Sequence, residues 1–68
     1  MVKNTFGKNL KHIRTSRNLT QEELAEKLGI VNSTISQYEN GLREPKFNTV
    51  NKIANLLNVT YDDLMSNH

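Results

Sequence analysis

The sequence predicts an all-α domain of five short helices. Apolar residues recur at helical spacing in four segments, and a threonine introduces a fifth, shorter one. Residues that begin or end helices, namely threonine, glycine and proline, stand between these segments. No segment alternates polar and apolar residues as a strand does, and the sequence has no internal repeat or low-complexity segment. We therefore expect one domain over residues 1–68, with its core at about 5–66.

The first helix is predicted over about residues 5–17. Phe6, Leu10 and Ile13 are spaced i, i+4, i+7 and so form one apolar stripe. The residues between them include lysine, histidine and arginine. The helix therefore has a buried side and a basic outer face.

The second helix is predicted to begin at a cap and to end at a glycine. Thr20 and Glu23 match a capping box, in which the threonine hydroxyl accepts a hydrogen bond from the N3 amide while Glu23 reaches back to the N-cap backbone. Gly29 is placed to end the helix with a positive φ. The buried face of this helix is formed by Leu24, Ala25 and Leu28.

The segment VNSTISQYENG, residues 31–41, contains the third predicted helix, and it has no lysine or arginine although the chain has a pI near 9.2. Ile35 and Tyr38 face inward at helical spacing, and Gly41 ends the helix. A loop follows, because Pro45 disfavours the helical conformation at the residue before it. The outer face of this helix is left with asparagine, serine and glutamine side chains.

Two further helices complete the predicted fold. The fourth has an apolar stripe formed by Phe47, Val50, Ile53, Ala54 and Leu57. Thr60 is expected to cap a short last helix, whose first turn carries Asp62 and Asp63, where negative charge is favourable to the helix dipole. Leu64 and Met65 of this helix are expected to face inward.

Composition restricts the class of protein. The 68 residues include no cysteine, which excludes disulfides and cysteine-ligated zinc. No apolar run approaches the roughly 18 residues of a membrane span, and no signal-peptide segment follows Met1. The net charge is only +2, but residues 1–18 include five lysines or arginines and no acid, whereas 60–68 include two aspartates and no lysine or arginine. This asymmetry suggests an anionic partner for one side of a cytoplasmic protein.

The second and third helices together form the motif that carries function. A capped helix of about eight residues, a glycine turn and a helix with a polar outer face have the sequence pattern of a helix-turn-helix, whose second helix enters the major groove. LTQEELAEKLGI followed by STISQYENGLREP resembles the lambda-repressor-like, Cro-like helix-turn-helix family, and the resemblance extends from about Phe6 to Leu64. It implies a compact five-helix DNA-binding domain.

The resemblance and the charge pattern imply roles for individual residues. Those expected to read base edges are Asn32, Ser33, Ser36 and Gln37. Those expected to contact DNA phosphates are Gln21, Asn40, Arg43, Lys46, Lys8 and Lys11. Gln21 would also brace the third helix, and Arg14 and Glu39 match a pair that ties the first helix to the third.

The sequence departs from the family pattern at two helix starts. Val31 stands where the family has a capping serine or threonine, and valine cannot cap. Either Asn32 becomes the cap, which puts its role as a base reader in doubt, or the helix is uncapped; Val31 can instead contact a thymine methyl group. Lys46 likewise replaces the usual cap of the fourth helix, which favours Asn48 as the start of that helix and leaves Lys46 for a phosphate.

The uncharged third helix predicts a division of tasks. Phosphate contacts supply affinity without sequence information, and lysine and arginine elsewhere can make them. Asparagine and glutamine amides match the N6/N7 edge of adenine, whereas arginine, the common partner of guanine, is missing from this helix. Readout of positions that contain A·T pairs is therefore expected.

The expected function is that of a homodimeric regulator of transcription bound to a palindromic operator in double-stranded DNA, in first place a small repressor of prophage, plasmid or chromosomal-switch type. The alternatives are a restriction-modification controller, an antitoxin-type autorepressor and a helical protein–protein adaptor. The subunits would meet through Tyr61, Leu64 and Met65. The sequence shows no nucleophile–base pair, metal-ligand spacing or small-molecule effector site, so we expect no enzyme activity, cofactor or metal.

Overall fold

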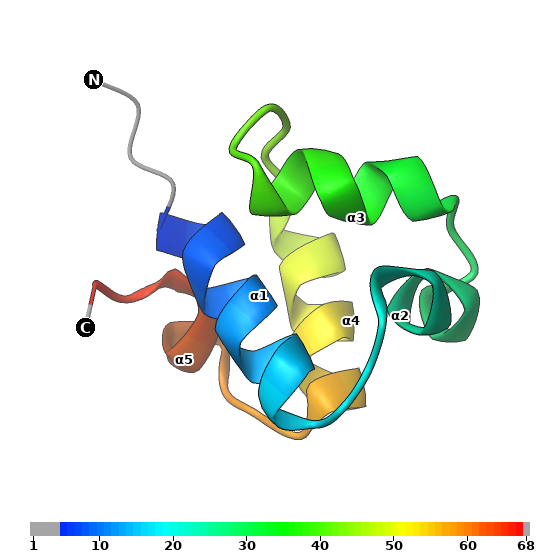
Figure 1. The fold of residues 1–68 in the computed structure, drawn as a ribbon. Coiled ribbons are helices and arrows are strands. Elements are labelled where there is room, and N and C mark those ends of the chain that lie inside the picture. Colours follow the sequence, from blue (N-terminus) through cyan, green and yellow to red (C-terminus); the bar gives the residue numbers. More distant parts are fainter. Residues whose placement is uncertain (1–4, 68) are drawn as a thin grey trace.

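Five helices account for the regular structure of residues 5–67, the part of the chain that the computed structural model describes (Figure 1). They are α1 (Thr5–Ser16), α2 (Gln21–Leu28), α3 (Asn32–Glu39), α4 (Phe47–Leu57) and α5 (Tyr61–Met65). The predicted all-α class is confirmed. α3 packs on α1 and α2, α5 packs on α1 and α4, and α4 also meets α2. Lys3 and His68 lie outside the described residues.

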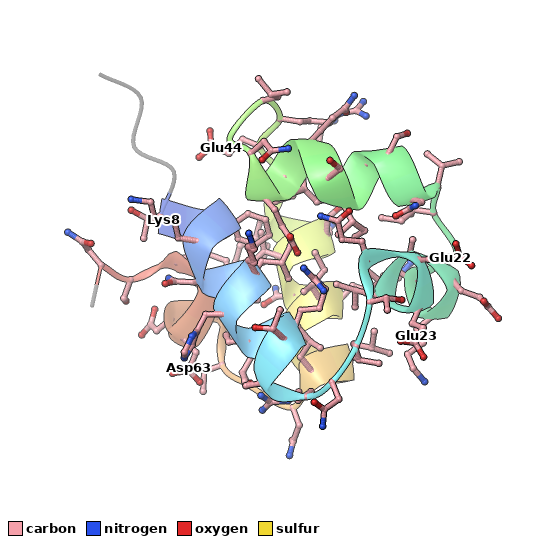
Figure 2. The ribbon with its side chains drawn as sticks, viewed as in Figure 1. Lys8, Glu22, Glu23, Glu44 and Asp63 are labelled. Carbon is pink, nitrogen blue, oxygen red and sulfur yellow. The ribbon has the colours of Figure 1, made fainter. Side chains whose placement is uncertain are left out.

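Capping boxes begin α2 and α5. At α2, Glu23 N–H donates to the Thr20 hydroxyl over 3.0 Å, and the Thr20 N–H donates to the Glu23 carboxylate over 2.8 Å. Thr60 and Asp63 repeat this arrangement at α5 over 3.0 and 2.9 Å; Figure 2 labels both acidic residues. The hydrogen bond from the Thr20 backbone holds the pKa of Glu23 below its ordinary value. Both predicted threonine caps are confirmed.

The four longer helices end in the same backbone turn. A residue with a positive φ follows each helix, namely Asn18 (57°), Gly29 (70°), Gly41 (74°) and Asn58 (57°). The next residue in each case is apolar, and its N–H donates to a carbonyl five positions earlier over 2.9–3.1 Å. The two predicted glycine ends are confirmed, and two asparagines end helices in the same way.

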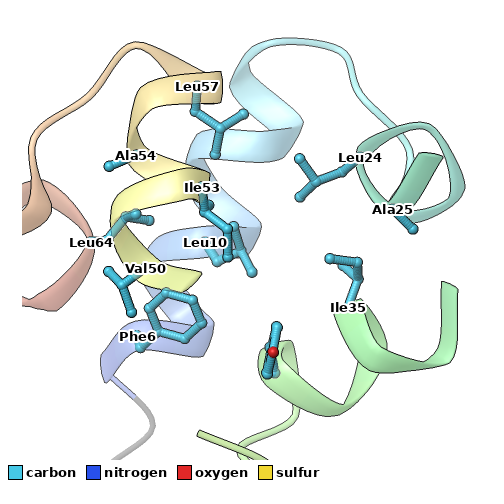
Figure 3. Packing of buried hydrophobic residues seen from close by; sticks show 11 residues of the cluster. Phe6, Leu10, Leu24, Ala25, Ile35, Val50, Ile53, Ala54, Leu57 and Leu64 are labelled. Atoms are coloured by element: carbon cyan, nitrogen blue, oxygen red, sulfur yellow. The ribbon is translucent and has the colours of Figure 1, made fainter. Parts of the chain in front are cut away.

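All five helices contribute side chains to one hydrophobic core (Figure 3). Its members are Phe6, Leu10, Leu24, Ala25, Ile35, Tyr38, Val50, Ile53, Ala54, Leu57 and Leu64. The rings of Phe6 and Tyr38 meet edge to face with their centroids 5.8 Å apart, which joins α1 to α3 inside the core. Leu64 has no exposed surface. The expectation that Leu64 forms part of a contact between subunits is therefore wrong, because this side chain is used by the core.

α4 begins one residue earlier than expected. Lys46 is the extended residue before the helix, and its side chain makes no capping hydrogen bond. The expected start at Asn48 is wrong, because the backbone is already helical at Phe47. Phe47 was expected to be buried, but it is 63% exposed. The first turn of α4 extends beyond the core, whose α4 contacts begin with Val50.

The uncapped start of α3 leads to a prediction about stability. Val31 precedes α3 in an extended conformation, makes no side-chain capping hydrogen bond and is 65% exposed. Val31→Ser should add a cap while losing little packing, so it should raise the free energy of unfolding by about 0.5–2 kcal/mol. Thermal unfolding followed by circular dichroism measures this change. Val31→Ala removes the same methyl groups without adding a cap; if the serine variant melts no higher than the alanine variant, the prediction is wrong.

Candidate nucleic-acid interface

The outer face of α3 carries amides and hydroxyls and no charged group. Asn32, Ser33, Ser36, Gln37 and Asn40 share this face because their spacing follows the helical repeat. Asn32, Ser33 and Asn40 are exposed, whereas Ser36 and Gln37 are half-buried. The Asn40 amide donates to the Ser36 hydroxyl over 3.3 Å. The structure therefore brings the five polar residues together as one surface, with one hydrogen bond inside it.

The start of α3 decides between the two alternatives that Val31 raised. Val31 is the residue before the helix, and Asn32 is its first helical residue and not its cap. The Thr34 N–H donates to the Val31 carbonyl over 3.1 Å, so the first turn is already closed there. The side chain of Asn32 is exposed beside that of Ser33.

A buried ion pair fixes the position of α3. Arg14 Nε donates to Glu39 Oε2 over 2.6 Å and Arg14 Nη2 donates to Glu39 Oε1 over 3.0 Å, with side-chain exposures of 9% and 3%. The third guanidinium nitrogen, Nη1, donates to the Leu19 carbonyl over 2.6 Å. Gln21, at the first residue of α2, donates to Glu39 Oε1 over 3.0 Å. One carboxylate of α3 is thus held by α1 and by the start of α2 together.

Basic side chains lie on the segments next to α3. Lys8 and Lys11 are exposed on α1, and Arg43 and Lys46 are exposed in the loop between α3 and α4. Figure 2 shows Lys8 at the first turn of α1 and Glu44 in that loop, both at the upper left of the view. The loop therefore contributes charges of both signs, in contrast to the neutral face of α3.

A second surface contains the residues expected to join subunits. Tyr61 and Met65 are half-buried on α5, and the ring of Phe47 lies against that of Tyr61 with their centroids 5.3 Å apart. Apolar periodicity missed Phe47 as a surface residue, because spacing gives the face of a helix and not the extent to which a neighbour covers it. Asn9 was also missed: its amide donates to the Leu64 carbonyl over 2.8 Å and to the Ser66 carbonyl over 2.9 Å, which fastens α5 to α1.

Residues 5–67 contain neither a metal-ligand cluster nor a membrane-spanning helix. No three histidine, aspartate or glutamate side chains of that range come together in a way that would hold a metal ion. None of its helices combines the length and the apolar character needed to cross a bilayer.

Comparison with known proteins assigns the family. Residues 10–64 match the helix-turn-helix family. The chain is 44% identical over 61 residues to ImmR of Bacillus subtilis, an HTH-type transcriptional regulator, and the alignment covers 90% of this chain and 48% of ImmR. The chain thus spans about half the length of curated relatives such as ImmR.

Two solved structures have the same arrangement of helices. The restriction-modification controller protein C.AhdI from Aeromonas hydrophila matches with a TM-score of 0.83 at 31% identity, over 90% of this chain and 92% of that one. SinR, the master regulator for biofilm formation solved in complex with DNA, matches with a TM-score of 0.83 at 29% identity, over 90% of this chain and 98% of that one. The chain belongs to the lambda-repressor-like, Cro/C1-type helix-turn-helix family of DNA-binding transcriptional regulators.

Proposed function

We propose that this chain acts as a cytoplasmic, sequence-specific regulator of transcription that binds double-stranded DNA, and in first place as a small repressor of prophage, plasmid or chromosomal-switch type. The observation that carries the proposal is the neutral outer face of α3, a row of exposed and half-buried amides and hydroxyls on a helix fixed by the Arg14–Glu39 pair. Such side chains discriminate between bases, whereas a surface used for phosphate alone would be basic. RstR of Vibrio cholerae, which is named as a phage transcriptional repressor and is 36% identical over 61 residues, supports repression.

A restriction-modification controller is the second candidate function. It is favoured by the match to C.AhdI, 92% of whose chain is covered. An antitoxin-type autorepressor would use the same surface. All three proteins would bind an operator through α3 and would differ in the genes that they control.

We assign base reading to Asn32, Ser33 and Gln37, with the Ser36 hydroxyl oriented by its hydrogen bond from Asn40. Each of these side chains can donate and accept hydrogen bonds, so each can distinguish one base edge from another. The amides match adenine best, which favours A·T pairs in the half-site.

Phosphate binding is assigned to the residues around this face. Gln21 uses one N–H of its amide on Glu39, which leaves the second N–H for a phosphate oxygen. Asn40 is placed in the same way, with one N–H on Ser36. The charged contacts would come from Lys8, Lys11, Arg43 and Lys46, all of which are exposed.

A homodimer is part of the proposal, because it would match the geometry of two-fold operators. Their half-sites lie roughly 34–36 Å apart, and this domain measures 30 × 22 × 22 Å. Two copies would place their α3 helices at that separation by meeting through a side of the domain that leaves α3 free. We propose the surface of Phe47, Tyr61 and Met65, since it combines an exposed aromatic ring with half-buried apolar neighbours on α5, a helix that packs on α1 and α4.

Phe47→Glu should therefore weaken dimerisation. Phe47 is 63% exposed and begins α4, where an acidic residue is favourable to the helix dipole, so the monomer should remain folded. Loss of a central aromatic contact should raise the dimer dissociation constant about tenfold or more. Sedimentation equilibrium measures that constant, and Leu56→Glu, at another exposed apolar residue of α4, is the matched control. Equal dissociation constants for the wild type and Phe47→Glu would place the interface elsewhere.

Selection of duplexes from a random pool tests the function as a whole. The expected product is a pair of inverted half-sites with centres about 10–10.5 base pairs apart and with A·T pairs at fixed positions. A pool that stays unenriched, while the protein binds all duplexes alike, would remove sequence-specific binding from consideration.

A further inference from the structure

We propose that Val31 reads the C5-methyl group of a pyrimidine at one position of each half-site. On this proposal thymine and 5-methylcytosine are preferred there over uracil and cytosine. The inference rests on the proposed function, because it concerns how the same surface selects its DNA.

Val31 is an apolar side chain presented at the end of the reading face. It is 65% exposed, and the two residues that follow it, Asn32 and Ser33, are exposed polar members of that face. The residue before it, Ile30, is half-buried and packs against the core. Along this segment, Val31 is thus the first residue whose side chain is exposed and not packed against the core. A ligand bound on α3 could therefore contact it.

The backbone holds this side chain in place. Val31 has φ −78° and ψ 148°, and its carbonyl accepts the Thr34 N–H over 3.1 Å as part of the first turn of α3. A valine side chain has a strongly restricted χ1 because it is branched at Cβ. Its methyl groups therefore have a nearly fixed position relative to Asn32, and little rotational freedom is lost when they make a contact.

The fold itself gives no reason for a valine here. The side chain neither caps α3 nor belongs to the core. Serine, threonine, asparagine or aspartate at this position would stabilise the helix start, so valine is the less stable choice for the isolated domain. A role in binding accounts for the choice.

The major groove offers one apolar group that fits this position. In a helix-turn-helix the N-terminal residues of the second helix contact the base edges. The groups that proteins read in the major groove are hydrogen-bond donors and acceptors together with one apolar group, the C5-methyl of thymine, where cytosine has only a hydrogen. 5-Methylcytosine carries the same methyl group at the same ring position. An A·T pair can thus be recognised by an amide on adenine and, independently, by Val31 on the methyl group of thymine.

Removal or addition of single C5-methyl groups in the DNA tests this inference. In the half-site returned by selection, each thymine is replaced in turn by uracil, and cytosine is compared with 5-methylcytosine at the position that responds. We expect one position at which loss of the methyl group weakens binding by about three- to five-fold, in both comparisons. Val31→Ser should reduce this difference to within twofold at that position, Val31→Ala should reduce it by less because its Cβ can still touch the methyl group, and both should leave the other positions unchanged. Leu42→Ala, which removes another exposed apolar side chain, should keep the wild-type pattern.

The outcomes separate this inference from the function on which it rests. Thymine-to-uracil ratios within twofold at every position, or ratios that survive both substitutions of Val31, overturn the role of Val31 while the selected site still supports sequence-specific binding. An effect with thymine but none with 5-methylcytosine also overturns it, because the methyl group is the same. If selection returns no site, both proposals fail. Loss of discrimination in Val31→Ser cannot come from unfolding, since that variant is expected to be the more stable one.

Discussion

Arg14→Ala should remove a large part of the stability of the domain. The guanidinium makes two hydrogen bonds to Glu39 and one to the Leu19 carbonyl, and both charged side chains are almost fully buried. Truncation of Arg14 leaves the Glu39 carboxylate buried without the guanidinium charge, although the hydrogen bond from Gln21 can persist. Loss of one partner of such a pair costs about 3–5 kcal/mol. Native domains are stable by roughly 0.05–0.15 kcal/mol per residue, which is about 3–10 kcal/mol for 68 residues, so the variant should lose about a third or more of its stability at 25 °C.

Urea denaturation at 25 °C measures the free energy of unfolding of this variant. Arg17→Ala is the matched control, because Arg17 is exposed one turn further along and its side chain contacts the Ser16 hydroxyl over 3.3 Å. The control should lie within about 0.5 kcal/mol of the wild type. Arg14→Lys should fall between the two, since lysine keeps the charge but lacks the planar fork that binds both carboxylate oxygens. A loss of DNA affinity in Arg14→Ala with unchanged stability would instead make Arg14 a contact to phosphate.

The core and the helix ends were predictable because their signals are local. The core residues of α1 to α4 lie on stripes that spacing alone defines, as Leu10 and Ile53 illustrate, whereas the helix of Leu64 was predicted from the cap at Thr60. The ends follow a similarly short pattern, a glycine or asparagine followed by an apolar residue. The two asparagine ends, Asn18 and Asn58, escaped prediction because asparagine tolerates a positive φ without requiring it.

Contacts between helices were harder to predict from the sequence. The Arg14–Glu39 pair came from the family resemblance, since residues 25 positions apart carry no periodic signal that links them. The Gln21 amide was expected at the DNA, and its hydrogen bond to Glu39 gives the physical means by which it braces α3. Phe47 marks the limit of a periodic argument: an apolar stripe continues to the first residue of α4, but the core does not. Burial at a helix end depends on the neighbouring helices, whose positions the sequence leaves unspecified.

Gln37→Ala should change specificity, whereas Arg43→Ala should change affinity. Gln37 lies half-buried on the neutral face of α3, where its amide can donate to and accept from one adenine. Its loss should reduce discrimination at one position of each half-site by about 1–3 kcal/mol. Because glutamine is uncharged, Gln37→Ala removes no charge, and the dependence of binding on salt should remain nearly that of the wild type.

Arg43 and Lys46 should behave in the opposite way, because both are exposed charges in the loop after α3. Loss of either should weaken operator and scrambled duplexes alike, and each lost phosphate contact should lower the salt slope by about one per subunit. Lys52→Ala is the matched control: it removes an exposed lysine from α4, on the side of that helix near Glu26 and Lys27 of α2, and should alter the binding of neither duplex appreciably. Fluorescence titrations of both duplexes at four salt concentrations separate the two effects. If Gln37→Ala weakens binding to the two duplexes equally, the neutral face of α3 does not select the sequence. If Arg43→Ala keeps the wild-type dependence of affinity on salt, Arg43 does not contact a phosphate.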